Sequence, residues 1–227
     1  MAKGTRIIMG NQAVDRRNVL NNLIYLTSLA GFQEITIPII EKAELYVDKA
    51  GPEILNQMYV FKDKGNRNLC LRPEGTATIQ ALVKKHFKTQ KDVKLFYFTP
   101  CYRYESPQAG RYREFYQFGV EWLNPSDYKV AKERLINLAR VLVEGAGIKW
   151  EQYWVNDDVK RGLDYYTEGG FEFNAEELGT QSQIVGGGRY DNGMGFAIGF
   201  DRLMLLKNNR KVIDVENRRV SNLRQNP

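Results

Sequence analysis

The sequence has few of the residues that build disulfide frameworks, zinc clusters and histidine-based catalytic sets. Among 227 residues there are two cysteines and one histidine. Cys70 and Cys101 each lie inside an apolar, strand-like run, which predicts buried free thiols of a reducing compartment and no metal site. His86 stands near a lysine-rich helix end, so a Ser-His-Asp or Cys-His catalytic set is not expected.

Long apolar runs are missing as well. No stretch approaches the roughly 18 apolar residues that a membrane span needs. Residues 1–9 carry Lys3 and Arg6 but lack the apolar core of a secretion signal. We therefore expect a cytoplasmic protein that is neither secreted nor inserted into a membrane.

The residues that are present describe one globular domain with a basic surplus. The chain is 43% hydrophobic and 26% charged, which fits a protein with a sizeable core. Lysine and arginine number 33 against 27 acidic residues, and the pI is about 9.2. This balance favours an anionic ligand such as a nucleotide or a nucleic acid, although solvated surface lysines would give the same value.

Apolar periodicity and turn residues predict an α+β domain with a mainly antiparallel β-sheet flanked by helices. The elements expected, in chain order, are a helix over 11–30, a strand over 34–40, a hairpin over 58–71, a helix over 76–86, strands over 93–104 and 115–122, a helix capped by Ser126 or Asp127 and closed by Gly145, short strands near 152–155, 170–173 and 183–185, a glycine-dense stretch over 186–199 and a helix over 200–206. Pro38 in this strand belongs at a sheet edge or where another element takes over the pairing, and such a strand could lie at a subunit interface. Neither a G-x-x-x-x-G-K-[ST] loop nor a complete G-x-G-x-x-G motif is present.

The densest polar group is the predicted strand end and loop over 103–113, which contains three arginines. The planar guanidinium binds phosphate oxygens through two parallel hydrogen bonds, so Arg103 and Arg111 are candidate phosphate ligands. A solvated hairpin tip is the alternative. Arg202 follows the glycines at 195 and 199 and is a second candidate, with an ordinary helix-surface arginine as its alternative.

Two pairs of polar residues are candidates for holding a small ligand. Glu74 and Thr76 lie where a strand ends and a helix begins, although a turn and an N-cap would need the same residues. Gln117 and Glu121 are four residues apart on a strand, so both face the same side of the sheet. That side suits an amine or an imidazole if it lines a cleft, and a wet outer face is the alternative.

Taken together, these segments resemble the catalytic core of histidyl-tRNA synthetase, a class II aminoacyl-tRNA synthetase, over about residues 4–206. The helix and strand ending at Pro38 resemble class II motif 1, which in the family builds the dimer interface. Motif 2 is similar to Tyr102-Arg103-Tyr104-Glu105 and its loop, and motif 3 to Gly199-Phe200-Asp201-Arg202-Leu203. The runs RGLDYY at 161–166 and GGRYD at 187–191 resemble the histidine-specific signatures.

The resemblance implies roles for individual residues. It assigns the nucleotide to Arg103 (α-phosphate), Glu105, Arg111, Phe115 (adenine stacking) and Arg202 (γ-phosphate side), and it assigns histidine to Glu74, Thr76, Gln117, Glu121, Arg161, Tyr165 and Tyr166. By the same resemblance, Glu121 and Tyr166 read the imidazole. Arg161 neutralises charge between the carboxylate and the α-phosphate, and Mg²⁺ is bound through the nucleotide.

The chain also departs from the family pattern. The residues between Glu121 and Arg161 are too few for the usual insertion domain, and no anticodon-binding domain is expected after Leu206. The expected organisation is therefore a catalytic domain over 1–206 and a polar, basic tail over 207–227, which is as compatible with a solvated extension as with RNA contact.

Three functions are compatible with this pattern. The first is activation of histidine to histidyl-adenylate with transfer to tRNA-His by a homodimer associated around Pro38. The second is a histidine-binding regulatory paralogue similar to the synthetase-like subunit of ATP phosphoribosyltransferase, and the third is adenylation for a non-tRNA acceptor. The arginines at 103, 111, 161 and 202 favour an enzyme, because a histidine sensor does not need nucleotide-binding arginines.

Overall fold

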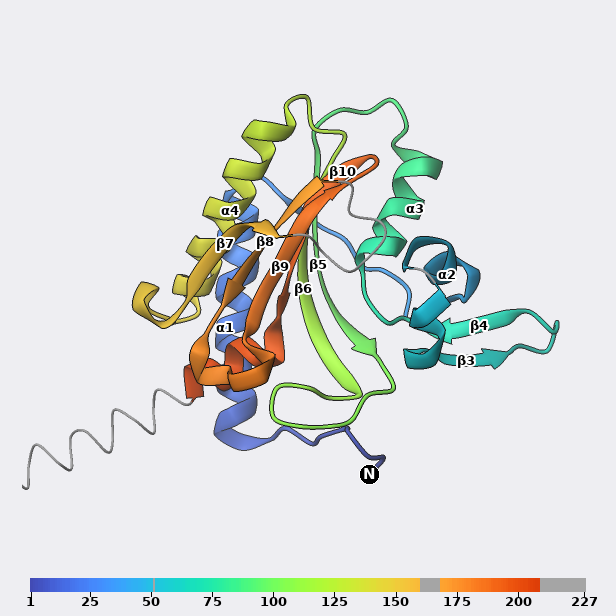
Figure 1. The fold of residues 1–227 in the computed structure, drawn as a ribbon, viewed down its shortest axis with the longest axis horizontal. Coiled ribbons are helices and arrows are strands. Elements are labelled where there is room, and N and C mark those ends of the chain that lie inside the picture. The colour runs from blue at the N-terminus through green and yellow to red at the C-terminus, as the bar shows by residue number, and fades with distance from the viewer. Residues whose placement is uncertain (51, 160–167, 209–227) are drawn as a thin grey trace, which may run out of the picture.

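A computed structural model describes residues 1–50, 52–159 and 168–208. A seven-stranded sheet forms its centre, and a three-stranded sheet projects from one side (Figure 1). The large sheet has the order β1 (Gln33–Glu34), β5 (Val93–Tyr102), β6 (Glu114–Leu123), β10 (Gly193–Gly199), β9 (Gln183–Tyr190), β8 (Glu168–Asn174) and β7 (Trp154–Val159). Only the β1–β5 pair is parallel, so the predicted α+β class with a mainly antiparallel sheet is confirmed.

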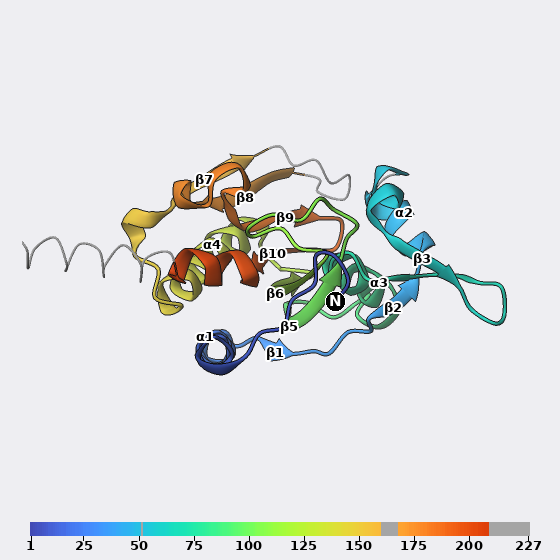
Figure 2. The same cartoon turned by 90° about the horizontal axis from the view of Figure 1, so that it is seen from below.

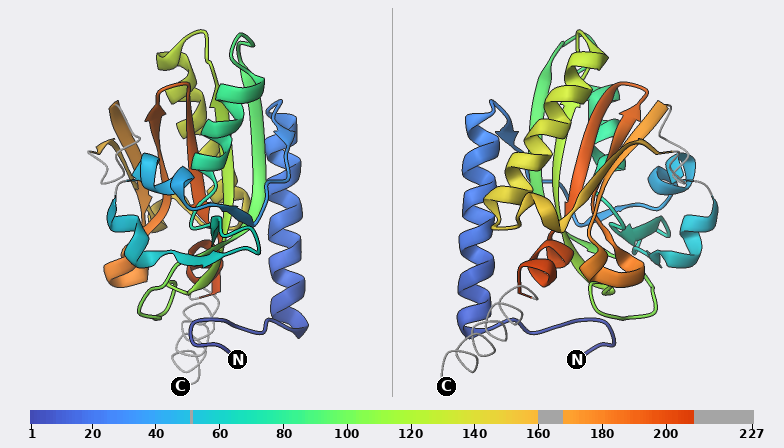
Figure 3. Two further views of the ribbon diagram at one scale, coloured as in Figure 1. Left: turned by 90° about the vertical axis from the view of Figure 1, so that its right-hand side faces the viewer. Right: turned by 60° about the vertical axis from the view of Figure 1, so that its left-hand side comes forward.

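The two faces of the large sheet have different partners because side chains alternate along each strand. On β6, Phe118, Val120 and Trp122 join the main core with residues of α1 (Gly10–Leu29) and α4 (Tyr128–Gly145). The odd-numbered positions point the other way, where a second core forms with α3 (Thr76–His86). Figure 2 shows these helices on opposite sides of the sheet, and Figure 3 shows α1 and α4 side by side.

Most of the predicted helices begin and end close to the expected residues. Asp127 caps α4, since its carboxylate accepts the backbone N–H of Lys129 at 2.8 Å and of Val130 at 3.1 Å. The last described helix spans residues 200–208 and thus continues two residues past the expected boundary at 206. Lys207 in this helix forms an ion pair of 2.5 Å with Asp15 of α1. Residues 209–227, which make up most of the expected tail, lie outside the described residues.

The glycine-dense stretch over 186–199 is β-structure, which the sequence prediction missed beyond 183–185. It forms most of β9 and all of β10, joined as a hairpin. These glycines accommodate large side chains of neighbouring strands: a Cβ built on Gly187 would overlap Phe171, and one on Gly195 would overlap Glu121. Glycine is therefore required here by close packing, not by a turn.

The expected strand over 34–40 is interrupted, and this expectation was wrong. β1 ends at Glu34, and the chain then crosses to the small sheet, where β2 (Ile40–Lys42), β4 (Asn68–Leu71) and β3 (Tyr59–Lys62) pair. Between the two sheets, the carbonyls of Ile37 and Pro38 accept hydrogen bonds from the buried Arg72 side chain. A side chain thus takes the place of a neighbouring strand.

Short helical segments complete the structure: α2 (Glu44–Ala50) and 3-10 turns at Pro52–Gln57, Trp150–Gln152 and Glu176–Gln181. The predicted hairpin over 58–71 is confirmed by the β3–β4 pairing. Cys70 and Cys101 are buried free thiols, and His86 is exposed at the end of α3, both as expected. None of the helices in the described ranges has the length and apolarity that crossing a bilayer requires.

Candidate active site

Most of the predicted site residues that the structure describes gather on the α3 face of the large sheet and at the strand ends beside it. One half contains buried carboxyl and amide groups from β6 and the start of α3. The other half contains arginines from the loop between β5 and β6 and from the helix over 200–208. The two halves meet at Arg103.

Glu121 lies at the centre of the buried half. Its side chain is fully buried on β6, where Oε1 accepts the Thr76 hydroxyl at 2.9 Å and Oε2 accepts the Tyr190 hydroxyl at 2.8 Å. Burial raises the pKa of Glu121 to about 8, although both hydrogen bonds act to lower it. A carboxyl group in this state can accept a hydrogen bond from a ligand amine or imidazole, or share its own proton with it.

Glu74 lies near Glu121 and binds the backbone at the start of α3. Its carboxylate accepts the backbone N–H groups of Thr76 at 2.6 Å and Ala77 at 2.8 Å, so it satisfies donors at the start of α3, as the N-cap alternative required. Burial raises the pKa of Glu74, while these two bonds and the charge of Arg103 lower it. Glu74 and Thr76 lie side by side at the start of α3, and their role in binding a ligand stays a prediction.

Gln117 and Glu121 both face α3, as their spacing on one strand predicts. The Oε1 atom of Gln117 accepts the backbone N–H of Gly75 at 3.3 Å and lies 3.4 Å from the Cys101 thiol. Burial raises the pKa of Cys101 and of Cys70 to about 12, so neither cysteine is a thiolate nucleophile near neutral pH. Glu121 is fully buried and Gln117 is partly buried, so the wet-outer-face alternative is wrong for Glu121.

The loop between β5 and β6 carries the second half of the site. Arg103 donates from Nε to the carbonyl of Pro73 at 2.9 Å, next to Glu74, and its guanidinium carbon lies 5.2 Å from the centre of the Phe115 ring. Arg111 and Glu105 form an ion pair across the loop. The loop is therefore cationic and held at its base, while Ser106, Gln108 and Ala109 at its tip are exposed, as the solvated-tip alternative expects.

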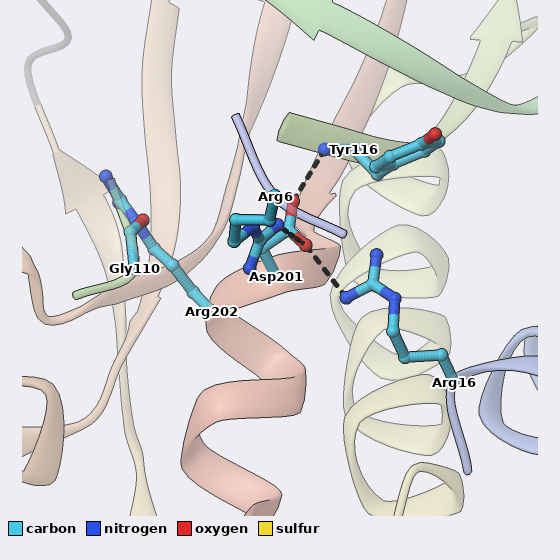
Figure 4. Close-up of polar contacts among 6 residues, drawn as sticks. All are labelled: Arg6, Arg16, Gly110, Tyr116, Asp201 and Arg202. Atoms are coloured by element: carbon cyan, nitrogen blue, oxygen red, sulfur yellow. Dashed lines mark hydrogen bonds and ion pairs between the residues drawn. The ribbon is translucent and has the colours of Figure 1, made fainter. Parts of the chain in front are cut away.

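Arg202 reaches this loop from the helix over 200–208. Its Nε donates to the carbonyl of Gly110 at 3.0 Å, and its two terminal nitrogens donate to Gln183 O at 3.0 Å and Gln181 Oε1 at 2.8 Å. Figure 4 shows Arg202 and Gly110 beside the neighbouring Asp201. Burial lowers the pKa of Arg202, but each terminal nitrogen keeps a second N–H that an anion could accept.

Three predicted residues, Arg161, Tyr165 and Tyr166, lie outside the described residues. Other residues of the site were missed by the sequence prediction. Tyr190 binds Glu121 and belongs to the GGRYD run, which was a signal for its role. Tyr97 is fully buried and lies across from Gly119 on the neighbouring strand. No sequence motif indicated its place in the site, because that place depends on how β5 and β6 are aligned.

The arrangement matches a ligand that is cationic or hydrogen-bonding at one end and anionic at the other. Buried carboxyl and amide oxygens of β6 and α3 would take an amine or imidazole, and the arginines of the loop and the last helix would take phosphate. In the described ranges no group of three or more histidine, cysteine, aspartate or glutamate side chains is placed to hold a metal ion.

Comparison with known proteins identifies relatives of this chain. The sequence model of the family described as histidyl-tRNA synthetase matches residues 4–152. A histidine-tRNA ligase of Methanospirillum hungatei is 30% identical over a match that covers 89% of this chain and 74% of that protein. This match runs over 303 residues, more than the whole 227-residue chain, so the relative contains segments without a counterpart here.

Two solved structures have the same fold. The apo histidyl-tRNA synthetase of S. aureus superposes with a TM-score of 0.76 at 25% identity, covering 93% of this chain and 70% of that one. A Bacillus halodurans structure described as an ATP phosphoribosyltransferase regulatory subunit/histidyl-tRNA synthetase gives a TM-score of 0.75 at 16% identity, covering 98% and 90%. The second likeness is evidence for the fold alone.

Proposed function

Because the chain belongs to the histidyl-tRNA synthetase family, we propose that it is a ligase that activates L-histidine with ATP and transfers the histidyl group to tRNA-His. The observation that carries this proposal is the buried Glu121, held by Thr76 and Tyr190 on a sheet face whose far end is lined by arginines. Such a site offers acceptors for an imidazole and donors for a nucleotide on neighbouring segments.

The buried half is the proposed histidine subsite. Glu121 reads the imidazole, because its carboxyl oxygens are the acceptors that an imidazole N–H requires. Glu74, Thr76 and Gln117 hold the α-amino group through carboxylate, hydroxyl and amide oxygens. Arg161, Tyr165 and Tyr166 complete this subsite in the proposal, on the strength of the RGLDYY run alone.

The arginine half is the proposed ATP subsite. Arg103 holds the α-phosphate, Phe115 stacks on the adenine, and Arg202 takes the γ-phosphate side. Arg111 and Glu105 contact the nucleotide as a pair. Mg²⁺ bound to the phosphates supplies further positive charge, and it would arrive with the nucleotide.

The chemistry needs positioning and charge stabilisation and no protein nucleophile. A carboxylate oxygen of histidine attacks the α-phosphorus, the bond to the bridging oxygen breaks, and pyrophosphate leaves. Arg103 lies at the junction of the two halves, where it stabilises the negative charge that builds up on the α-phosphate. In the second step a terminal ribose hydroxyl of tRNA attacks the histidyl carbonyl and AMP leaves.

A regulatory, histidine-binding paralogue is the second candidate, because the fold shared with the B. halodurans structure does not by itself separate a sensor from an enzyme. A histidine sensor needs the buried half of the site only. The ordered arginine half, with Arg103 beside Phe115 and Arg202 beside Gly110, supports the enzyme instead. Transfer of the adenylate to an acceptor other than tRNA is a variant of the first candidate.

We also propose a homodimer in the cytoplasm. The outer face of α1 exposes Val14, Tyr25 and Leu29, and Ile39 and Ile40 are exposed beside Pro38. The first three side chains lie on the helix that resembles part of class II motif 1, and the two isoleucines directly follow the motif's end at Pro38. A second copy of the chain would cover them.

The experiment that tests the proposal is charging of a tRNA-His transcript with radiolabelled histidine and ATP. We expect charging by the wild-type chain, loss of at least about a hundredfold in Arg103→Ala, and no change in Arg134→Ala, an exposed arginine of α4 on the opposite sheet face. Histidyl-adenylate formation without charging would indicate another acceptor. Saturable histidine binding without adenylate would favour the regulatory paralogue.

A further inference from the structure

The first residues of the chain contact both segments that carry the ATP-site arginines. The carbonyl of Gly4 accepts the backbone N–H of Arg113 at 2.9 Å, at the end of the loop between β5 and β6. The guanidinium of Arg6 stacks 3.4 Å from the centre of the Tyr112 ring in the same loop. Gly4 has a φ of +82°, and a Cβ there would press on the Arg113 side chain, so the contact depends on glycine.

Arg6 also connects this loop to the last helix through Asp201. The Oδ1 atom of Asp201 accepts hydrogen bonds from Arg6 at 2.5 Å and from Arg16 of α1 at 2.8 Å (Figure 4). The Asp201 side chain is only 3% exposed, so these are ion pairs largely shielded from water. We use the term N-terminal brace for the four residues that make these contacts, Gly4, Arg6, Arg16 and Asp201.

Asp201 makes a third contact, to the backbone of β6. The register between β10 and β6 ends at Gly199 opposite Gln117. One residue further along β6, the backbone N–H of Tyr116 donates to Asp201 Oδ2 at 2.7 Å. The carboxylate therefore extends the strand pairing by one residue, between Phe115 of the proposed ATP subsite and Gln117 of the proposed histidine subsite.

Arg202, the next residue on the helix, contacts the loop between β5 and β6 and not β6 itself. Its Nε bonds to Gly110 in the loop, while Asp201 holds β6 and Arg6 (Figure 4). The loop, β6 and the helix are thus tied together by two adjacent residues and the N-terminal segment. Hydrogen-bonded ion pairs fix direction as well as distance, which apolar packing alone does not.

We infer that Asp201, acting through the N-terminal brace, is a positioning residue that sets the placement of Arg202 and of the loop arginines for ATP. This inference rests on the proposed function, because it assumes that these arginines bind the nucleotide. Asp201 itself touches no substrate in this account. Its carboxylate is already used by two arginines and one backbone N–H.

The test compares Asp201→Asn and Arg6→Ala with wild type by steady-state ATP–pyrophosphate exchange. Asn keeps an acceptor for the Tyr116 N–H but loses the charge. Arg6→Ala removes a partly exposed side chain, so we expect this variant to fold. We expect the KM for ATP to rise about tenfold in each variant and the KM for histidine to change less than twofold. The effects of the two substitutions should be less than additive in the double variant, because the two side chains share one ion pair.

Lys207→Ala is the matched control. It removes another ion pair between the same helix and α1, to Asp15, but touches neither the loop nor β6. We expect its KM for ATP to stay within twofold of wild type. An equal rise in the control would overturn the inference, since it would trace the effect to general loosening of the helix.

Hydrogen exchange of residues 103–116 supplies a readout that does not depend on activity. Faster exchange in Arg6→Ala and Asp201→Asn than in Lys207→Ala is the expected result. If wild type is active and neither variant alters the KM for ATP, the inference fails while the proposed function stands. If wild type shows no exchange of pyrophosphate with any amino acid, the proposed function fails and the inferred ATP role falls with it, whatever the hydrogen exchange shows.

Discussion

At the scale of single residues, the protonation state of Glu121 has the most direct consequence for ligand binding. Its pKa of about 8 means that the carboxyl group is protonated in the free protein at neutral pH. A free histidine imidazole has a pKa of about 6.5 and is then mostly unprotonated. At a pH between these two pKa values, Glu121 carries a proton and the free imidazole does not. The bound carboxyl–imidazole pair shares this one proton, so binding neither takes up nor releases a proton.

This predicts a plateau of histidine affinity between about pH 6.5 and pH 8. Above pH 8 both groups have lost their protons, so binding must take one up, and affinity falls about tenfold per pH unit. Below pH 6.5 both groups are protonated, so binding must release one proton and affinity falls again. Calorimetric titration with histidine across this range measures both limbs.

The Glu121→Gln variant is the control for this assignment. An amide cannot gain or lose the proton, so the decline that begins near pH 8 should disappear while affinity at pH 7 drops about tenfold or more. An unchanged alkaline decline in the variant would assign it to the α-amino group of histidine and refute the Glu121 assignment.

Gly195 is the second residue whose substitution tests the site. It lies directly across from Glu121 on the neighbouring strand, and a Cβ there would overlap Glu121 Oε2. We expect Gly195→Ala to displace the carboxylate and to weaken histidine binding more than about tenfold in a folded protein. Gly65→Ala, where the nearest heavy atom would lie 3.4 Å from the new Cβ, should bind histidine like wild type.

At the scale of elements, Arg72 joins the two sheets. Its guanidinium is fully buried and donates to the carbonyls of Ile37, Pro38 and Pro100 and to the Thr99 hydroxyl. These bonds hold the segment between β1 and β2 against β5. No role for Arg72 was predicted from the sequence.

Arg72→Met should lower the free energy of unfolding by at least about 3 kcal/mol, because several buried acceptors lose a charged donor. Urea denaturation measures this loss. Arg67→Ala removes an exposed ion pair with Asp63 in the β3–β4 hairpin and should cost less than about 1 kcal/mol. Similar losses in the two variants would contradict the role assigned to Arg72.

Local sequence patterns predicted the elements whose partners lie nearby in the chain. Helices α1, α3 and α4 and the β5–β6 and β3–β4 hairpins follow from apolar spacing, caps and turns. The strands over 186–199 did not, because glycine has low strand propensity and its use here depends on Phe171 and Glu121 of other strands. The break after Glu34 depends on Arg72, which also lies far away in sequence.

The same limit applies to the site at the scale of the whole molecule. The motifs around Arg103, Gln117 and Arg202 were visible as residue patterns. The Arg6–Asp201 pair, separated by 195 residues, was not, since nothing in either segment indicates its partner. Sequence therefore predicted the groups proposed to touch the substrates better than the groups that hold them in place.

The proposed dimer gives a prediction at this scale. We expect the wild-type chain to be a dimer at micromolar concentration in light scattering. Ile40→Glu places a charge on an exposed apolar position, 52% accessible, beside Pro38 and should give a folded monomer. Val141→Glu, on the exposed side of α4, should stay dimeric. A wild-type monomer would refute the proposal.

The central claim is that one site binds histidine and ATP for adenylation. It is tested most directly by ATP–pyrophosphate exchange measured with each of the standard amino acids. The account predicts exchange that depends on histidine, with no other amino acid supporting more than a trace, and its loss in Arg103→Ala. Absence of exchange from a folded protein that binds histidine, or exchange with a different amino acid, would contradict it.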